Sequence, residues 1–462
     1  MADYRSLAIE YAHQNRDRFL NTLKELVSIP SVSTSPENKT DMFRAADMLA
    51  GHLTRLGMEN VTVFPTSGHP VVFGEYQGAG NDLPTVLIYG HYDVQPSEPD
   101  ELWDTPAFEP SLRGDNLFAR GASDMKGQVV AVLSAIEAIQ QISELPVNVK
   151  FILEGEEEIG SPNLARFLQD HKDLLSSDFA LNPDAGMIAA DIPTIVYGLR
   201  GLAYFELRIY GPAHDLHSGL FGGVVHNPAQ ALCELIAGMH DENGQITLPG
   251  FYNRVRELPE EERNELARLP MDEQYYRQQM GVSQTWGEAG FTPIERVGAR
   301  PTLEINGLLS GFTGKGSKTV IPAYAMAKIS MRLVPDQDPA EVHQQLTQYM
   351  EQNAPPTIRW EIAPMAGGPA SMSDPHHPAT EALASALEQV WGKHPVYKRE
   401  GGSVPVVGDM QKILSIESVL TGFGLPDDNL HAPNEKLHLP TWFKGIDALI
   451  HFFYNLKEYR KQ

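Results

Sequence analysis

The stretch PTVLIYGHYDVQP, residues 84–96, joins an apolar segment to a polar pair, and it decides how the first part of the chain folds. Its segment TVLIY, residues 85–89, has the short apolar composition of a strand that is covered on both faces of a sheet. Gly90 follows, and then His91 and Asp93 stand one residue apart. Because open α/β sheets bind ligands at the carboxyl edge of their strands, this order predicts a polar site at the end of the strand.

Helix and strand patterns alternate on both sides of this segment. Residues 35–57 predict a helix that ends at Gly57. Its apolar face is formed by Met42, Ala45, Ala46, Leu49, Leu53 and Leu56. Residues 126–142 predict a second helix, and the segments 147–153 and 177–182 predict further strands. This alternation predicts an α/β domain with a mostly parallel sheet that helices cover on both faces.

The pattern changes near residue 200, where strands with alternating faces begin. The expected elements are strands at 201–211, 325–335 and 357–364 and helices at 226–239 and 338–352, with a long polar stretch at 241–300. Helix and strand patterns typical of the first domain return after residue 380. We therefore expect one domain in two parts, residues 1–197 and 381–462, interrupted by an inserted α+β domain at 198–380.

Composition limits the classes of partner. The net charge of −24 disfavours nucleic acid and anionic membranes, because both would repel the chain. No apolar run reaches the roughly 18 residues of a membrane span, and the first residues lack the apolar core of a secretion signal. The single cysteine, Cys233, excludes an internal disulfide and is predicted to be a small core residue. These features predict a cytoplasmic protein.

Histidines and carboxylates follow the predicted strands in order. The groups are His91 with Asp93, Asp124 before a helix, Glu156, Glu157 and Glu158, Asp184, and His431. Each has a structural alternative, since an aspartate before a helix commonly caps it, a glutamate run is commonly a solvated turn, and a lone histidine is commonly structural. Their joint order at strand ends favours a shared site.

Imidazole and carboxylate together suit Zn²⁺, with Mn²⁺ or Co²⁺ as alternatives. A single catalytic zinc needs only three protein ligands and a water. The larger set of candidates in this chain therefore indicates two ions about 3.5–4 Å apart that share one carboxylate.

Five motifs carry a family resemblance: GHYDVQP (90–96), RGASDMKGQ (120–128), EGEEEIGS (154–161), NPDAG (182–186) and NLHAPNE (429–435). Together they resemble the di-zinc metallopeptidases of the carnosinase-like and cytosolic non-specific dipeptidase type, which are related to acetylornithine deacetylase and succinyl-diaminopimelate desuccinylase. The resemblance covers nearly the whole chain. It implies two Zn²⁺ per chain, a catalytic domain with a zinc-peptidase-like fold, and an inserted domain that acts as a lid and forms a homodimer.

The resemblance also implies a role for each polar residue. Asp124 would bridge the two ions, His91 and Asp184 would bind one of them, and Glu158 and His431 would bind the other. Asp93 would orient the imidazole of His91. Glu157 would be the general base that takes a proton from the water between the ions, and Glu156 would not be a ligand.

In the inserted region the resemblance implies contacts with the substrate. His217 would donate a hydrogen bond to the developing oxyanion, from the partner subunit across a two-fold interface. Arg332 would grip the free carboxylate of the substrate. Asn227, Thr319, Gly402 and Ser403 would complete the substrate-binding set.

Three functions remain open from the sequence. The first is a dipeptidase acting on short peptides with a free C-terminal carboxylate. The second is an N-acyl amino acid deacylase or desuccinylase that uses the same ions. The third is a non-catalytic metal-binding relative, which the presence of Glu157 beside Glu158 disfavours.

Overall fold

The structure is a computed structural model that describes residues 3–402 and 405–458. The described chain divides into two compact units. The first comprises the described residues within Met1–Tyr197, Ser373–Lys398 and Asp409–Gln462, and the second comprises those within Gly198–Met372 and Arg399–Gly408. Residues 373–398 therefore fold with the first unit, and the short segment 399–408 returns to the second, whereas the sequence pattern predicts a single break at 380.

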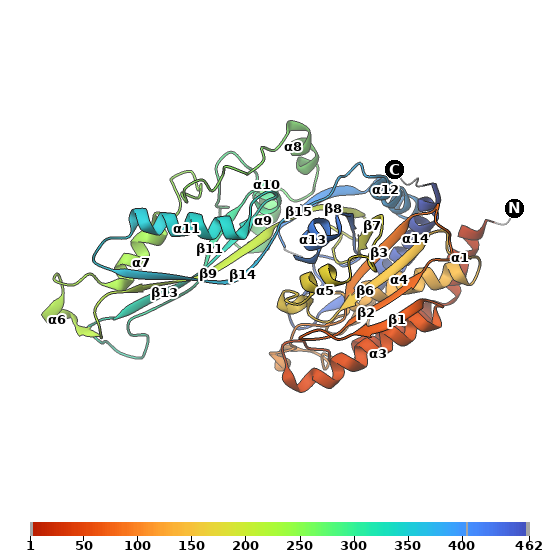
Figure 1. Cartoon of the computed structure of the whole chain (residues 1–462), viewed down its shortest axis with the longest axis horizontal. Coiled ribbons are helices and arrows are strands. Elements are labelled where there is room, and N and C mark those ends of the chain that lie inside the picture. The colour runs from red at the N-terminus through yellow and green to blue at the C-terminus, as the bar shows by residue number, and fades with distance from the viewer. Residues whose placement is uncertain (1–2, 403–404, 459–462) are drawn as a thin grey trace. The chain divides into compact units, whose positions relative to one another are not determined.

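The first unit is built on a mixed sheet (Figure 1). Its strands are β1 (Glu59–Phe64), β2 (Val71–Tyr76), β3 (Thr85–His91), β6 (Asn148–Glu154), β7 (Phe179–Asn182), β8 (Thr194–Leu199), β16 (Val396–Glu400) and β17 (Glu417–Leu420). Along the sheet the order is β1-β2-β6-β3-β7-β17-β8. The central strands β6, β3, β7 and β17 are parallel, and the flanking pairs are antiparallel.

The predicted α/β class is confirmed, but the sheet is mixed rather than mostly parallel. The connection between β1 and β2 is too short for the helical crossover that parallel strands need, so these two strands pair as antiparallel neighbours. The four parallel strands in the middle are the ones whose carboxyl ends meet at one edge.

Helices surround this sheet. They are α1 (Tyr4–Gln14), α2 (Arg16–Val27), α3 (Lys39–Arg55), α4 (Lys126–Gln140), α5 (Leu164–Asp170), α12 (Pro378–Trp391) and α14 (Leu439–Asn455). Helix α4 is buried along almost its whole length, as expected of a helix that is apolar all round, and it packs against α1, α2, α14 and β3. Helix α3 packs its predicted apolar face on β1 and β2.

A small antiparallel sheet completes the first unit. It consists of β4 (Ser111–Arg113), β5 (Asn116–Phe118) and β18 (Lys436–His438), in the order β18-β5-β4. Because Lys436 pairs with Phe118, this sheet brings the chain just before residue 436 beside the chain just after residue 118. Two segments that are more than 300 residues apart in sequence thereby become neighbours.

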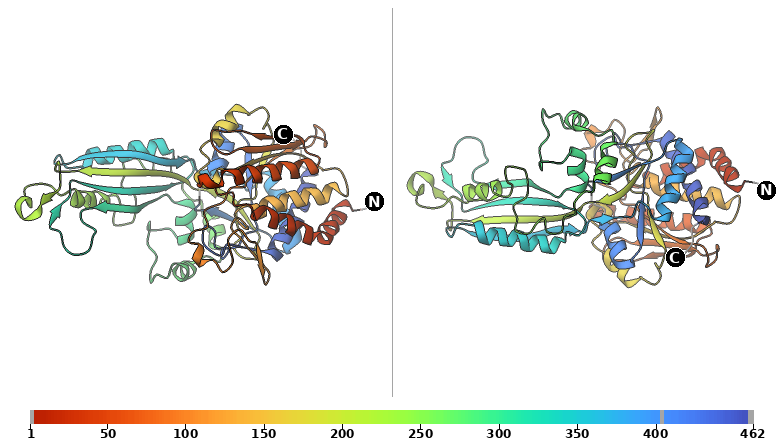
Figure 2. Two further views of the ribbon diagram at one scale, coloured as in Figure 1. Left: turned by 90° about the horizontal axis from the view of Figure 1, so that it is seen from below. Right: turned by 90° about the horizontal axis from the view of Figure 1, so that it is seen from above.

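The second unit has an antiparallel sheet in the order β11-β13-β9-β14. These strands are β11 (Thr302–Ser310), β13 (Tyr324–Leu333), β9 (Gly201–Tyr210) and β14 (Arg359–Gly368). Helices α7 (Pro228–Ala237) and α11 (Pro339–Asn353) lie along these strands (Figures 1 and 2). Every second residue of β9 and β13 is buried, so that residues such as Phe205 and Ile329 form one core with Leu232 and Leu346.

The remaining elements of the second unit are short. They are β10 (Leu216–His217), α6 (Ser218–Phe221), α8 (Glu260–Ala267), α9 (Glu273–Met280), α10 (Pro293–Ala299), β12 (Val320–Ile321), β15 (Ser371–Met372) and α13 (Pro405–Asp409). The polar stretch 241–300 thus contains three helices in this structure.

The prediction that Cys233 is a core residue is wrong, because Cys233 is exposed. Helix α7 buries Ala231, Leu232 and Leu235 and leaves Cys233 outside that face.

Within residues 3–402 and 405–458, no helix combines the length and the apolar character that crossing a membrane requires.

Candidate metal centre

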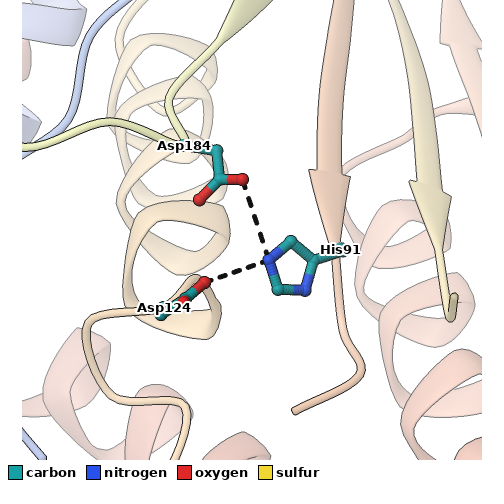
Figure 3. Close-up of side chains that lie close together, drawn as sticks. All are labelled: His91, Asp124 and Asp184. Atoms are coloured by element: carbon teal, nitrogen blue, oxygen red, sulfur yellow. Dashed lines mark hydrogen bonds and ion pairs between the residues drawn. The ribbon is translucent and has the colours of Figure 1, made fainter. Parts of the chain in front are cut away.

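The polar residues of the first unit gather where the parallel strands end. His91 is the last residue of β3, and Asp184 follows shortly after β7. Glu157 and Glu158 belong to a short 3₁₀ helix (Glu157–Ile159) just beyond β6. Since β6, β3 and β7 are parallel neighbours, their carboxyl ends bring these side chains to one edge of the sheet. Asp124 joins them from the residues just before α4 (Figure 3).

Two groups of potential ligands share Asp124. In the first group, His91 Nε2 lies 3.1 Å from Asp124 Oδ1 and 3.8 Å from Asp184 Oδ2 (Figure 3). In the second, His431 Nε2 lies 3.0 Å from Asp124 Oδ2 and 3.2 Å from Glu158 Oε2. Within each group the ligand atoms all lie within 4.8 Å of one another. Asp124 thus turns one carboxylate oxygen toward each group, which is the arrangement a bridging ligand requires.

The electrostatics of the cluster favour cations. Burial opposes a charge on His91, yet hydrogen bonds with Asp124 and Asp93 raise the pKa of this imidazole well above its usual value. Hydrogen bonds with Asp124 and Glu158 raise the pKa of His431 to about 10. The carboxylates therefore stabilise positive charge at both ends of Asp124, and imidazole with carboxylate is a donor set that fits divalent transition metals. The residues present fit a metal centre.

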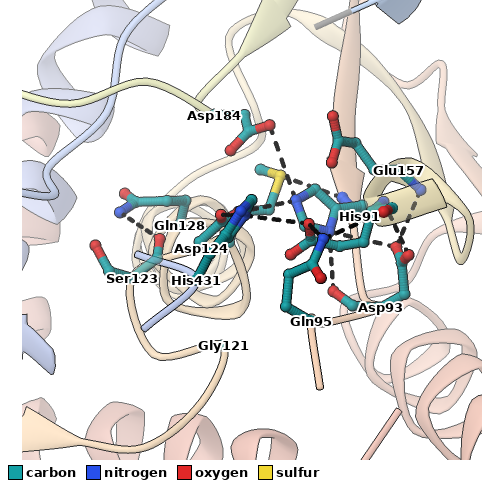
Figure 4. Close-up of polar contacts among 12 residues, drawn as sticks. His91, Asp93, Gln95, Gly121, Ser123, Asp124, Gln128, Glu157, Asp184 and His431 are labelled. Atoms are coloured by element: carbon teal, nitrogen blue, oxygen red, sulfur yellow. Dashed lines mark hydrogen bonds and ion pairs between the residues drawn. The ribbon is translucent and has the colours of Figure 1, made fainter. Parts of the chain in front are cut away.

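Asp93 connects His91 to the glutamates. Its backbone oxygen lies 3.0 Å from His91 Nδ1, and its carboxylate Oδ1 lies 3.4 Å from the same nitrogen. The backbone N–H groups of Glu157 and Glu158 donate to the Asp93 carboxylate, at 3.2 and 3.0 Å (Figure 4). Asp93 is fully buried, so it fixes the strand end and the turn after β6 in one geometry. The contact of Asp93 with His91 was predicted from the sequence, whereas its hydrogen bonds with the backbone of Glu157 and Glu158 were not.

The three consecutive glutamates have different surroundings. The buried carboxylate of Glu156 accepts hydrogen bonds from the His69 backbone and the Asn163 side chain, and Glu158 belongs to the second ligand group. Burial raises the pKa of Glu157 well above its usual value; His91 opposes this rise, and nearby carboxylates such as Asp184 add to it. Glu157 is thus a buried carboxyl group that interacts electrostatically with members of both ligand groups.

Two further residues, Gln95 and Glu435, contact the candidate ligands, although the sequence did not predict these contacts. Gln95 donates from Nε2 to Glu158 Oε2 at 2.8 Å and to the Glu158 carbonyl at 3.2 Å, which orients that carboxylate. Glu435 accepts hydrogen bonds from backbone N–H groups around Asp124. Both residues stand inside recognisable motifs, but nothing in the local sequence indicates which side chains they contact.

The predicted substrate-binding residues that the structure describes lie in the second unit. His217 is exposed at the start of α6, where its Nδ1 accepts from Gly219 N at 3.0 Å. Asn227 caps α7 through a 2.9 Å hydrogen bond from Ala229 N. Arg332 is half-buried on β13, where burial lowers its pKa. Thr319 and Gly402 are exposed, and Ser403 lies outside the described residues.

An α/β unit with imidazoles and carboxylates at the carboxyl edge of its parallel strands has the architecture of a metal-dependent hydrolase. The chain belongs to peptidase family M20/M25/M40, whose family model matches residues 87–455. The predicted family and enzyme class are therefore confirmed.

Two relatives and one solved structure illustrate this similarity. The chain is 32% identical to the Cys-Gly metallodipeptidase dug1 of Schizosaccharomyces pombe, over 97% of each protein. It is also 32% identical to the Beta-Ala-His dipeptidase of Homo sapiens, over 97% of this chain and 92% of that protein. The structure of the M20 family metallo-carboxypeptidase Sso-CP2 from Sulfolobus solfataricus matches with a TM-score of 0.86 at 33% identity, covering 95% of this chain and 99% of that one.

Proposed function

We propose that this chain is a metal-dependent dipeptidase that hydrolyses the peptide bond of dipeptides or short peptides with a free C-terminal carboxylate. The observation that carries the proposal is the pair of ligand groups sharing Asp124. The named dipeptidases among the relatives match almost the whole chain, which favours peptide substrates over the acylated amines of a deacylase or desuccinylase.

In this proposal His91 and Asp184 hold one divalent ion, Glu158 and His431 hold the other, and Asp124 serves both. We propose Zn²⁺ for both ions, with Mn²⁺ or Co²⁺ as alternatives, because the donors are imidazole and carboxylate without thiolate. When bound, such ions supply Lewis acidity that polarises the scissile carbonyl and makes water a better nucleophile at neutral pH.

The protein residues provide the proton transfers and the positioning. Glu157 takes a proton from the attacking water and can return it to the leaving amine. Its electrostatic interactions with His91, Asp124 and Glu158 support this role, because they place the carboxylate beside both ligand groups. Asp93 keeps His91 and Glu157 in fixed relation through its hydrogen bonds to both. Because Glu157 and Glu158 lie in the same short 3₁₀ helix, the position of Glu158 also fixes the position of Glu157.

For the substrate, we propose that Arg332 binds the C-terminal carboxylate with its guanidinium fork. His217 would donate to the developing oxyanion, and Asn227, Thr319, Gly402 and Ser403 would line the substrate side of the site. The exposure of His217 and its position before the glycines of 218–223 support a residue that can contact a second molecule. The cytoplasmic location predicted from the sequence stays a prediction.

Metal analysis combined with a substrate panel tests this function. The panel should contain dipeptides, acetylornithine and a succinylated diamine, each assayed with the metal-loaded protein and after chelation. We expect hydrolysis of dipeptides that is lost on chelation and restored by metal. Preferential turnover of acetylornithine or the succinylated amine would instead assign a deacylase, and metal binding without any turnover would assign a non-catalytic relative.

Arg332→Ala should impair hydrolysis of peptides with a free C-terminal carboxylate far more than hydrolysis of their amidated counterparts. The lost charge-assisted hydrogen bonds are worth roughly 1.5–3 kcal/mol. The measurement is kcat/KM for matched free and amidated dipeptides, with Arg208→Ala as a control because that arginine pairs with Glu206 on the exposed side of the same sheet. Equal losses for both substrates would show that Arg332 does not recognise the carboxylate.

We further propose a homodimer in which His217 serves the active site of the partner subunit. The apolar side chains of Leu220, Phe221 and Val224 are exposed beside His217, at 74%, 42% and 84% of their full area, which supports a contact surface there. A two-fold interface would make the exchange of His217 reciprocal.

Mixing two inactive variants tests this exchange. In a heterodimer of Glu157→Gln and His217→Ala, supply from the partner leaves one site with both lesions and the other with neither. Random exchange should then restore about a quarter of wild-type activity, because about half the dimers are mixed and half of their sites are whole. Purification through two different tags isolates the mixed dimer. If that dimer carries its full metal content and is inactive, His217 acts within its own chain.

A further inference from the structure

The loop that carries His431 has an unfavourable backbone. Asn429, His431 and Asn434 have φ values of 54°, 59° and 61°, in the left-handed region that residues other than glycine rarely adopt. Such conformations persist only where surrounding contacts impose them. The side chain of His431 is 55% exposed, so packing around the imidazole contributes little to its position. Contacts elsewhere in the loop must therefore place His431. They include the hydrogen bonds of Asn434 with Asp104 N and the Leu102 carbonyl, and the contacts of the residues at the two ends of the loop.

Glu435 forms one of these ends and is 1% exposed. Its Oε1 accepts from Ser123 N at 3.0 Å and from Asp124 N at 3.1 Å. Its Oε2 accepts from Gly121 N at 2.9 Å and from Arg120 Nη1 at 2.8 Å. One buried carboxylate thus binds the backbone on which Asp124 stands, and it is four residues from His431 in the sequence.

Asp428 forms the other end and is fully buried. Its Oδ2 accepts from Ser123 Oγ and from Leu425 N, both at 2.8 Å, and its Oδ1 accepts from Lys436 Nζ at 3.1 Å. Asp428 therefore joins the same two segments as Glu435. The difference is that Asp428 accepts from the side chain of Ser123, whereas Glu435 accepts from the backbone N–H groups of Ser123 and Asp124.

The two ligand groups depend on this loop to different degrees. In the first group, His91 ends a strand and its side chain is fully buried, and the backbone N of Asp184 is held by Asn182 Oδ1 at 2.9 Å just after β7. In the second group, His431 comes from the left-handed loop. The distance of 3.0 Å between His431 and Asp124 is thus set by contacts between two loops rather than by the sheet.

We propose that Glu435 is a positioning residue that links the two metal sites by holding the backbone of Asp124 to the loop that carries His431. The inference rests on the proposed two-ion function and adds a residue outside its ligand set. The second site depends on Glu435 more than the first site does. His91 ends β3 and Asp184 follows β7, so these two ligands of the first site stay in place when the loop shifts.

Calorimetric titration of the chelated full-length protein with Zn²⁺ tests the proposal. Glu435→Gln keeps the shape of the side chain but gives it an amide N–H₂ that cannot accept from the backbone donors. We expect the wild type to bind two equivalents. In Glu435→Gln the first equivalent should bind within about threefold of the wild type, and the second should weaken by about 10–100-fold, as for loss of other groups that orient metal ligands. Dipeptidase kcat should fall at limiting Zn²⁺ and recover in excess Zn²⁺ with KM unchanged.

Two variants separate positioning from general stability. Asp428→Asn disturbs the same pair of loops without touching the Asp124 backbone, so it should weaken the second equivalent less than Glu435→Gln does. Glu435→Gln leaves the buried guanidinium of Arg120 without its ion-pair partner, and adding Arg120→Met removes that charge. The double variant should therefore recover the melting temperature of the chelated protein and still bind the second ion weakly. This double variant also provides the test if Glu435→Gln alone does not fold.

Equal weakening of both ions in the double variant, or wild-type affinity for both, would overturn the role of Glu435. An effect of Asp428→Asn as large as that of Glu435→Gln would also overturn it, since it would reflect the stability of the loop. A wild-type chain that binds one equivalent would overturn the two-ion function itself, which distinguishes the two failures.

Discussion

Glu157→Gln should retain both metal ions and lose about 10²–10⁴-fold in kcat. The amide has the size of the carboxylate but cannot accept a proton from water. The variant should leave the turn after β6 intact, because the backbone N–H of residue 157 still donates to the Asp93 carboxylate. Metal content by elemental analysis and single-turnover kinetics with a dipeptide provide the measurement.

The neighbouring glutamates are the matched controls. Glu156→Gln changes a carboxylate that bonds His69 N and Asn163, so its effect should fall mainly on the melting temperature. Glu158→Gln removes a member of the second ligand group, so it should lower the metal content. If Glu157→Gln loses an ion and Glu158→Gln keeps both, the assignment of base and ligand is shifted by one residue.

Asp124→Ala should weaken both ions together and abolish measurable turnover. One oxygen of Asp124 lies 3.1 Å from His91 Nε2 and the other lies 3.0 Å from His431 Nε2, so a single substitution removes a donor from both groups. The loss at each site should exceed the roughly 10–100-fold cost of removing a group that only orients a ligand. Titration of the chelated protein with Zn²⁺ measures both affinities.

Asp184→Ala is the comparison for this prediction, because Asp184 belongs to the first group alone. It should weaken one ion and spare the other. Circular dichroism of the chelated variants should remain that of the wild type, which assigns the losses to the ligands rather than to folding. Retention of one ion at wild-type affinity in Asp124→Ala would contradict a shared carboxylate.

The α/β class and the order of the polar residues along the chain follow from local sequence alone. Local composition was sufficient, because TVLIY at 85–89 and the largely apolar VNVKFIL at 147–153 predict strands, and a polar residue directly after a strand must lie at its carboxyl end. The motifs around His91, Asp124 and His431 added the family, which the match over residues 87–455 confirms.

How these residues meet depends on contacts between distant segments of the chain. The hydrogen bonds from Glu157 and Glu158 to Asp93, and the return of the described residues within 399–408 to the second unit, have no local signature. The exposure of Cys233 likewise depends on which face of α7 meets its sheet. Glu435 reaches the backbone of Asp124 across 311 positions of sequence because β18 pairs with β5. The pattern of a segment predicts whether that segment is buried. It does not predict the hydrogen-bond partners of a buried carboxylate such as that of Glu435, because the pairing of strands from distant segments sets them.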